Sequence, residues 1–145
     1  MQAIAETVPT SRAALWTGRV LSGLVVLFLL FDGAIKLPPL DIVTETSAQI
    51  GLPATAEFAR MLGILTLVST VLYAWPRTAV LGAILLTGYL GGAIAIHLRI
   101  GSPLFTHTLF GVYLGLMVWG GLYLRDEQVR ALIPFVKSGP EARTS

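Results

Sequence analysis

Charged side chains interrupt the apolar stretches of this chain at positions where they could bind a polar head group or move protons. Asp32 and Lys36 end the first stretch one helical turn apart, in the order that favours an ion pair, and Glu57 and Arg60 open the second stretch. Carboxylates inside a membrane bundle are functional candidates, because a desolvated carboxylate can abstract a proton. Asp32 and Glu57 are therefore predicted catalytic residues, and Lys36 and Arg60 predicted ligand-binding residues.

The two histidines flank the connection between the third and fourth stretches. His107 shares a helical stripe with Gly111 and Gly115, so its imidazole is predicted to face the bundle interior, where it can exchange a proton with a head group. His107 is the third predicted catalytic residue, and His97 and Arg99 are predicted ligand-binding residues. A metal site is not predicted and haem is disfavoured, because two histidines without a third ligand are a weak metal signal.

Each of these groups also has a purely structural explanation. Lys36 can extend toward the interface and neutralise Asp32, and Glu57 can offset the positive end of a helix that Thr55 caps. In that case the charged residues would only stabilise the helix bundle.

The composition places these groups in a membrane protein. Of the 145 residues, 54% are apolar and 12% are charged, which is more apolar surface than one soluble core of this size can hide. Four stretches have the roughly 20 apolar residues that a membrane-spanning helix needs, namely 13–35, 58–75, 78–96 and 104–123. The predicted fold is all-α: a single integral membrane domain built as an antiparallel four-helix bundle.

Basic residues predict the orientation of this bundle. They gather at one level of the predicted helices: Arg12, Arg19, Arg77, Arg125, Arg130, Lys137 and Arg143. Basic residues are retained on the cytoplasmic side, so both termini are predicted to be cytoplasmic and the polar cluster to face outward. Aromatic residues favour the same alignment: Trp16, Tyr73, Trp75, Trp119 and Tyr123. The net charge of +2 thus reflects topology, and no nucleic-acid partner is predicted.

The connections between the stretches differ in length. Residues 36–55 form the one long outer loop, in which a short amphipathic helix could act as a lid or merely cap the bundle. Residues 126–136 are predicted to form a cytoplasmic interfacial helix. Glycine pairs at 88 and 92 and at 111 and 115 predict faces of close helix packing, with His97 pointing away from the first pair. Further glycines at 120 and 121 leave room for a homo-oligomer.

The chain has no cysteine, which excludes thiol-disulfide chemistry and thiolate metal sites within it. It also lacks a phosphate-binding glycine loop, a nucleophile elbow and a paired-histidine zinc motif. The sequence therefore predicts no soluble catalytic domain.

Three segments resemble the DoxX-like family of bacterial four-helix membrane proteins. They are the run from Phe31 to Lys36, the turn from Trp75 to Ala79, and the stretch from Gly88 to Arg99 that continues into 103–107. Relatives of that family include the small subunit of a thiosulfate:quinone oxidoreductase, proteins of methylamine dehydrogenase maturation, and the membrane part of vitamin K-dependent carboxylase. The resemblance implies a multi-pass protein of the bacterial inner (plasma) membrane with a link to quinone or redox chemistry.

Three functions remain open from the sequence. In the favoured one, Tyr89, Phe110 and Phe31 line a slot for a quinone or another small lipophilic ligand, and His107, Arg99 and Asp32 bind its head group. A redox partner subunit would fit this role. The first alternative is a small membrane enzyme that performs acid-base chemistry, such as an isomerisation, on a lipophilic substrate. The second alternative is a non-catalytic accessory subunit.

Overall fold

The computed structural model describes residues 10–133, and these residues are helical almost throughout. Four helical segments are long and apolar enough to cross a membrane. They comprise α1 (Arg12–Ile35), α3 (Ala56–Ala74), α4 (Ala79–Arg99), and the π-helical turn η1 (Leu104–Thr108) followed by α5 (Phe110–Arg125). Two short helices, α2 (Asp41–Gln49) and α6 (Glu127–Leu132), complete the fold. The predicted all-α membrane bundle is confirmed.

Helix bounds differ slightly from the predicted ones at the polar end. The second long helix begins at Ala56, where the Thr55 hydroxyl accepts a hydrogen bond from the Phe58 backbone, and the third continues through Arg99. The loop of residues 36–55 contains α2, and the C-terminal helix ends at Leu132. The remainder of the predicted helix 126–136, and the basic residues Lys137 and Arg143, lie outside the described residues.

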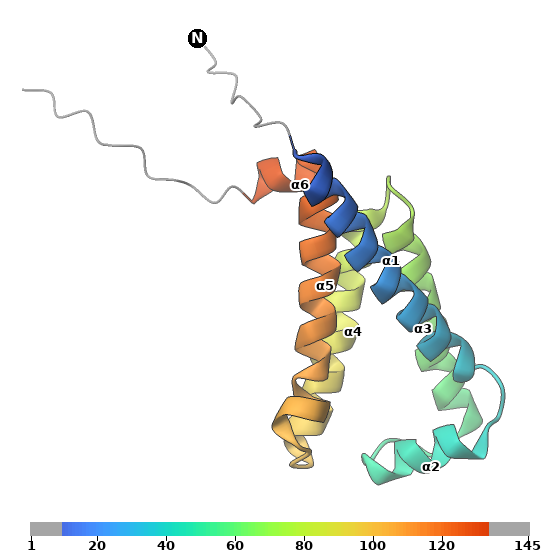
Figure 1. The fold of residues 1–145 in the computed structure, drawn as a ribbon. Coiled ribbons are helices and arrows are strands. Elements are labelled where there is room, and N and C mark those ends of the chain that lie inside the picture. Colours follow the sequence, from blue (N-terminus) through green and yellow to red (C-terminus); the bar gives the residue numbers. More distant parts are fainter. Residues whose placement is uncertain (1–9, 134–145) are drawn as a thin grey trace, which may run out of the picture.

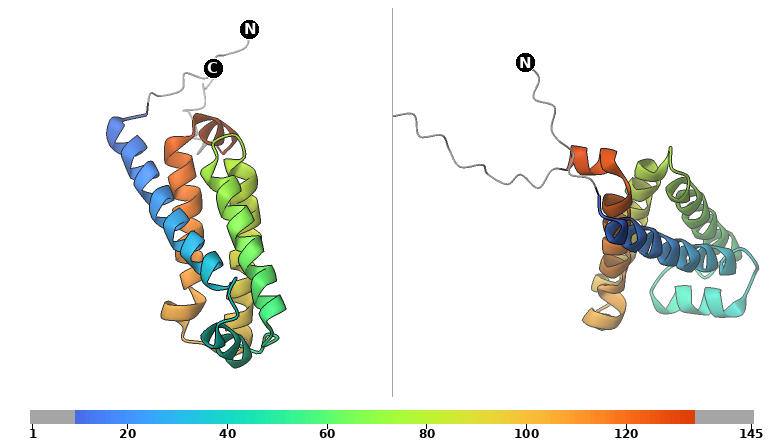
Figure 2. Two further views of the ribbon diagram at one scale, coloured as in Figure 1. Left: turned by 90° about the vertical axis from the view of Figure 1, so that its right-hand side faces the viewer. Right: turned by 45° about the horizontal axis from the view of Figure 1, so that its top comes forward.

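The four long helices form a ring in which α1 packs against α5 and α3, and α4 packs against the same two helices. Figures 1 and 2 show that the ring is not uniform along its length. The helices converge at the end that carries α6 and the turn between α3 and α4, which we call the closed end. At the other end α1 and α3 diverge from α4 and α5, and α2 lies there; we call this the open end.

Glycines permit the close approaches between α1 and its two neighbours. A Cβ atom on Gly18 would lie 2.9 Å from the carbonyl oxygen of Gly121 in α5, and one on Gly63 would lie 2.7 Å from that of Gly33. Such distances leave no room for a side chain. Van der Waals packing at small residues therefore holds these helices together, as expected where lipid removes most of the hydrophobic force between helices.

The packing faces predicted for α4 and α5 are only partly correct. Gly111 packs against Ile94 and Leu90 of α4, but no atom lies within 4 Å of a Cβ on Gly88, Gly92 or Gly115. The glycine that packs α4 against α3 is Gly82, where a Cβ would overlap the backbone of Tyr73. Figure 1 shows that α3 and α4 diverge beyond their short connecting turn, which fits the open space at Gly88 and Gly92 on α4.

A buried polar network joins three helices at the closed end. The Tyr73 hydroxyl donates to the carbonyl oxygen of Val118 (2.7 Å) and lies 2.9 Å from the Ser22 hydroxyl. Arg125 donates to Ser22 (3.0 Å) and to the backbone carbonyl of Tyr73 (3.3 Å). Tyr73 lies at the same end as Arg125, as predicted, but it has no exposed surface and so does not face the membrane interface. The close crossing at Gly82 turns this position of α3 inward.

Candidate functional site

The open end contains a cavity of about 660 Å³ bounded by α1, α2, α3 and α4. Most of its lining is apolar. Its polar residues come from the last turn of α1, from α2 and from α4: Asp32, Lys36, Thr46, Ser47, Tyr89 and His97. Four of the nine predicted site residues thus line one cavity, namely Asp32, Lys36, Tyr89 and His97.

A charged pair and a phenol form one polar group in this cavity. Lys36 makes an ion pair with the Asp32 carboxylate and also donates to the Asp32 backbone carbonyl (3.1 Å). The Tyr89 hydroxyl lies 3.5 Å from Oδ2 of the same carboxylate. The side chains of Lys36 and Asp32 retain 18% and 30% of their exposure. The group can therefore still offer N–H and O–H donors and a carboxylate acceptor to a ligand.

The apolar wall of the cavity is formed largely by α3 and α4. Leu62 and Leu65 contribute from α3, and Gly88, Gly92 and Ala93 contribute from α4. Gly88 and Gly92 are exposed, and Leu65 is 45% exposed. These residues belong to candidate membrane-spanning helices, so the cavity is open on a side formed by such helices.

Two arginines hold the loop that carries α2 at the open end. Arg99 donates to the carbonyl oxygens of Ile50 (3.0 Å) and Gly51 (3.5 Å), and Arg60 donates to that of Leu37 (3.0 Å). Neither guanidinium lines the cavity. Their partners are backbone carbonyls of the loop, although both arginines were predicted to bind a ligand. They position the loop.

Glu57 lies outside the cavity, on the exposed first turn of α3. Within residues 10–133 it makes no hydrogen bond or ion pair. This position matches the structural explanation, in which its charge offsets the positive end of the helix.

His97 lines the cavity together with Gly88 and Gly92, so the expectation that it points away from them is wrong. The cavity-lining face of α4 is wide and is centred on Tyr89 and Ala93. The Nδ1 atom of His97 is hydrogen-bonded to the Ser102 hydroxyl (2.9 Å).

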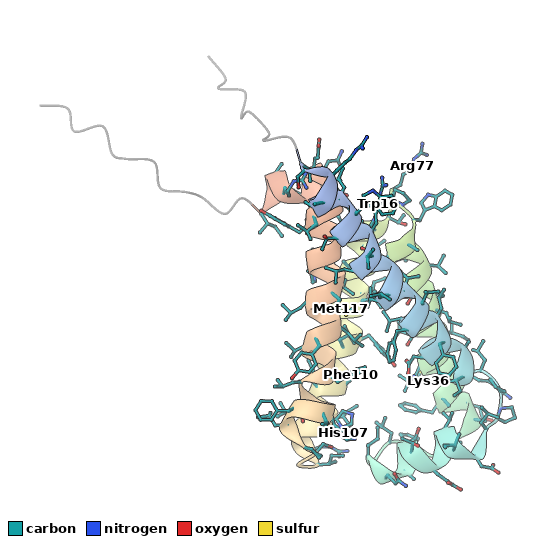
Figure 3. The ribbon with its side chains drawn as sticks, viewed as in Figure 1. Trp16, Lys36, Arg77, His107, Phe110 and Met117 are labelled. Carbon is teal, nitrogen blue, oxygen red and sulfur yellow. The ribbon has the colours of Figure 1, made fainter. Side chains whose placement is uncertain are left out.

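His107 is exposed and does not line the cavity, so its predicted burial in the bundle interior is wrong. Residues 104–108 form a π-helical turn, which shifts the register of the stripe, and the buried position is Thr108, with 2% exposure. The centre of the His107 ring lies 5.9 Å from that of His97. Figure 3 shows His107 on the side of η1 turned toward α2, and Lys36 across from it.

Of the three aromatic residues predicted to line the slot, Tyr89 lines the cavity and the two phenylalanines do not. Phe110 packs edge-to-face on Phe28 with ring centres 5.4 Å apart, and Phe31 is 67% exposed. The cavity also uses residues of α2, the segment predicted as a possible lid or cap, and two α3 leucines that the sequence did not single out. The amphipathic pattern of 41–50 was the available signal, because its apolar face had to cover part of the bundle.

Comparison with protein families matches residues 20–121 to the DoxX-like family. Comparison with curated proteins and with solved structures finds no match. The family match extends from α1 into α5 and includes every element that lines the cavity. The chain belongs to the DoxX-like family, and it is a membrane protein with four candidate transmembrane helices.

Proposed function

We propose that the cavity binds a small lipophilic molecule with a quinone-like head group, in a redox-linked role. The observation that carries this proposal is an apolar cavity of about 660 Å³ with an ion pair and a phenol at one place in its wall. Ligand sites typically have volumes of about 300–1,000 Å³, mostly apolar walls and a few polar groups that orient the ligand.

The polar group suits both oxidation states of a quinone. Quinone oxygens accept hydrogen bonds, which Lys36 and the Tyr89 hydroxyl can donate. A quinol hydroxyl donates instead, and the Asp32 carboxylate can accept. A head group here would replace part of the contact between Lys36 and Asp32, so that neither charge is left without a partner.

A lipophilic ligand would enter from the bilayer. The cavity is exposed along Leu65, Gly88 and Gly92 on membrane-spanning helices, while α2 covers it from the outer side. The absence of side chains at Gly88 and Gly92 widens this opening. An isoprenoid or alkyl tail would extend from it into the lipid.

The geometry gives less support to an acid-base enzyme. Of the three predicted catalytic residues, only Asp32 lines the cavity, and it is paired with Lys36. An accessory subunit without a ligand would not need a cavity with polar groups in its wall.

The proposed orientation has the closed end in the cytoplasm and the cavity near the outer face of a bacterial inner membrane. Trp16 and Arg77 mark the closed end in Figure 3, which fits the retention of basic residues in the cytoplasm. Reporter fusions after Asp126 and within residues 41–50 should give opposite signals. Equal signals would overturn this orientation.

A cavity-filling variant tests the proposed ligand. Gly92→Leu adds a side chain where nothing lies within 4 Å, so it should fill the cavity without moving a helix, whereas Gly91→Leu is an equally open site that does not line the cavity. The measurement is binding of decylubiquinone to protein in detergent. Gly92→Leu should weaken binding at least about tenfold, which corresponds to about 1.4 kcal/mol, and Gly91→Leu should leave it unchanged.

Failure of the wild type to bind decylubiquinone, or equal loss in the two leucine variants, would contradict the proposal. Organic extraction of the purified protein provides a second readout. A quinone absorption spectrum should appear with the wild type and disappear with Gly92→Leu.

A further inference from the structure

The two histidines form a pair at the outer edge of the cavity that the proposed ligand site does not use. His97 comes from the last turn of α4 and His107 from η1, which packs against that helix. Their ring centres lie 5.9 Å apart, and the ring planes are inclined by 59°, which is not a stacked arrangement. The pair therefore needs an explanation other than ring stacking.

Both imidazoles are held through the same ring nitrogen. Nδ1 of His97 is hydrogen-bonded to the Ser102 hydroxyl at 2.9 Å, and Nδ1 of His107 to the Thr106 hydroxyl at 2.8 Å. When Nδ1 carries the proton and donates it to an oxygen, Nε2 keeps its lone pair. Histidines that bind metals almost always have such a partner on the second nitrogen, because it fixes the tautomer and the ring orientation.

From these observations we propose that His97 and His107 bind one transition-metal ion of the Cu²⁺ or Zn²⁺ class through their Nε2 atoms. An ion about 2.1 Å from Nε2 lies about 3.2 Å from the ring centre, so two rings on one ion have centres about 5.2 Å apart at a tetrahedral angle and about 6.4 Å apart when opposite. The observed separation of 5.9 Å falls within this range. Imidazole is a ligand that suits both ions.

The surroundings leave room for such an ion. His107 is exposed, so water can complete the coordination. Arg99, two residues from His97, turns its guanidinium to the carbonyls of Ile50 and Gly51, where its charge is engaged. Within residues 10–133 no group of three or more histidine or acidic side chains could hold an ion, so the site has two protein ligands and open positions.

The sequence makes this proposal easy to test, because the chain has two histidines and no cysteine. Protein purified without a histidine tag is titrated with Cu²⁺ in detergent. Pulsed EPR, which detects the remote nitrogen of each coordinated imidazole, should count two imidazoles in the wild type. His97→Gln and His107→Gln should each leave one, and each should raise the Kd by more than tenfold.

Variants of the hydroxyl partners separate a built site from chance binding. Ser102→Ala removes the group that orients His97 and should raise the Kd about tenfold, while Thr44→Ala, which removes a hydroxyl of α2 that is bonded only to a backbone carbonyl, should not change it. Melting without copper shows whether each variant is folded. One imidazole in the wild type, or an unchanged Kd in His107→Gln, would overturn the proposal whether or not the cavity binds a quinone.

Discussion

At the closed end, glycine and tyrosine are packed against neighbouring helices, whereas at the open end the same residue types border a cavity. A Cβ on Gly82 would overlap the backbone of α3, but nothing lies within 4 Å of one on Gly88, less than two turns farther along α4. Tyr73 is fully buried and its hydroxyl has two partners, while Tyr89 is only partly buried and faces the cavity. The closed end is thus tightly packed, and the open end has the space that the proposed ligand needs.

The partners of the polar side chains also differ between the two ends. Arg125 is shared between Ser22 and the carbonyl of Tyr73, inside a network that joins α1, α3 and α5. Asp32 and Lys36 instead pair within one helix and remain partly exposed. A network across helices stabilises the fold, whereas a pair within one helix can change partners without moving a helix. The following predictions test this distinction.

The largest expected effect is at the crossing of α3 and α4. Gly82→Leu should prevent recovery of folded protein in detergent, because the added side chain must displace the Tyr73 backbone and overpacking in a tight core costs about 1–3 kcal/mol or more. Gly88→Leu, the matched change on the same helix, should fold with little change in Tm. Similar melting curves for the two variants would show that the ends are not packed differently.

An intermediate effect is expected from removing one hydroxyl at each end. Tyr73→Phe removes two buried hydrogen bonds, to the Val118 carbonyl and to the Ser22 hydroxyl, and should cost about 1–3 kcal/mol of stability. Tyr89→Phe should leave the Tm nearly unchanged and weaken decylubiquinone binding instead. The measurements are thermal melting and ligand titration of both variants; the reverse pattern would contradict the assignment of the two tyrosines.

The smallest expected effect on stability is at the charged pair. Asp32→Asn should cost about 1 kcal/mol or less, because the pair is partly exposed and lies within one helix. It should nevertheless weaken quinol binding, whereas Asp41→Asn, on the exposed first turn of α2, should not. A loss of several kcal/mol in Asp32→Asn would contradict this account, because it would mean that Asp32 belongs to a charge network across helices.

Helix number, helix ends and membrane character could be predicted from the sequence, since they depend on local apolar length, caps and turns. The gathering of Asp32, Lys36 and His97 at one end of the bundle follows from the hairpin arrangement of those helices. These properties need no knowledge of how far two helices diverge.

The partners of individual side chains were harder to predict. Gly82 and Gly88 look alike in sequence, and only the divergence of α3 and α4 separates a packed glycine from an open one. The π-helical turn shifted His107 out of the stripe that a regular helix would give it. Arg60 and Arg99 donate hydrogen bonds to backbone carbonyls of the loop between α1 and α3, and no residue pattern specifies the path of that loop.

Ligand protection of single cysteines tests most directly the claim that the open end holds a lipophilic molecule. The chain has no cysteine, so Ala93→Cys, in the cavity wall, and Ala95→Cys, exposed on the same helix outside it, can each be alkylated alone. Saturating decylubiquinone should slow the reaction of N-ethylmaleimide with Ala93→Cys at least about tenfold, as occupancy above about 90% requires, and leave Ala95→Cys unchanged. Equal rates with and without the quinone at Ala93→Cys would contradict the account.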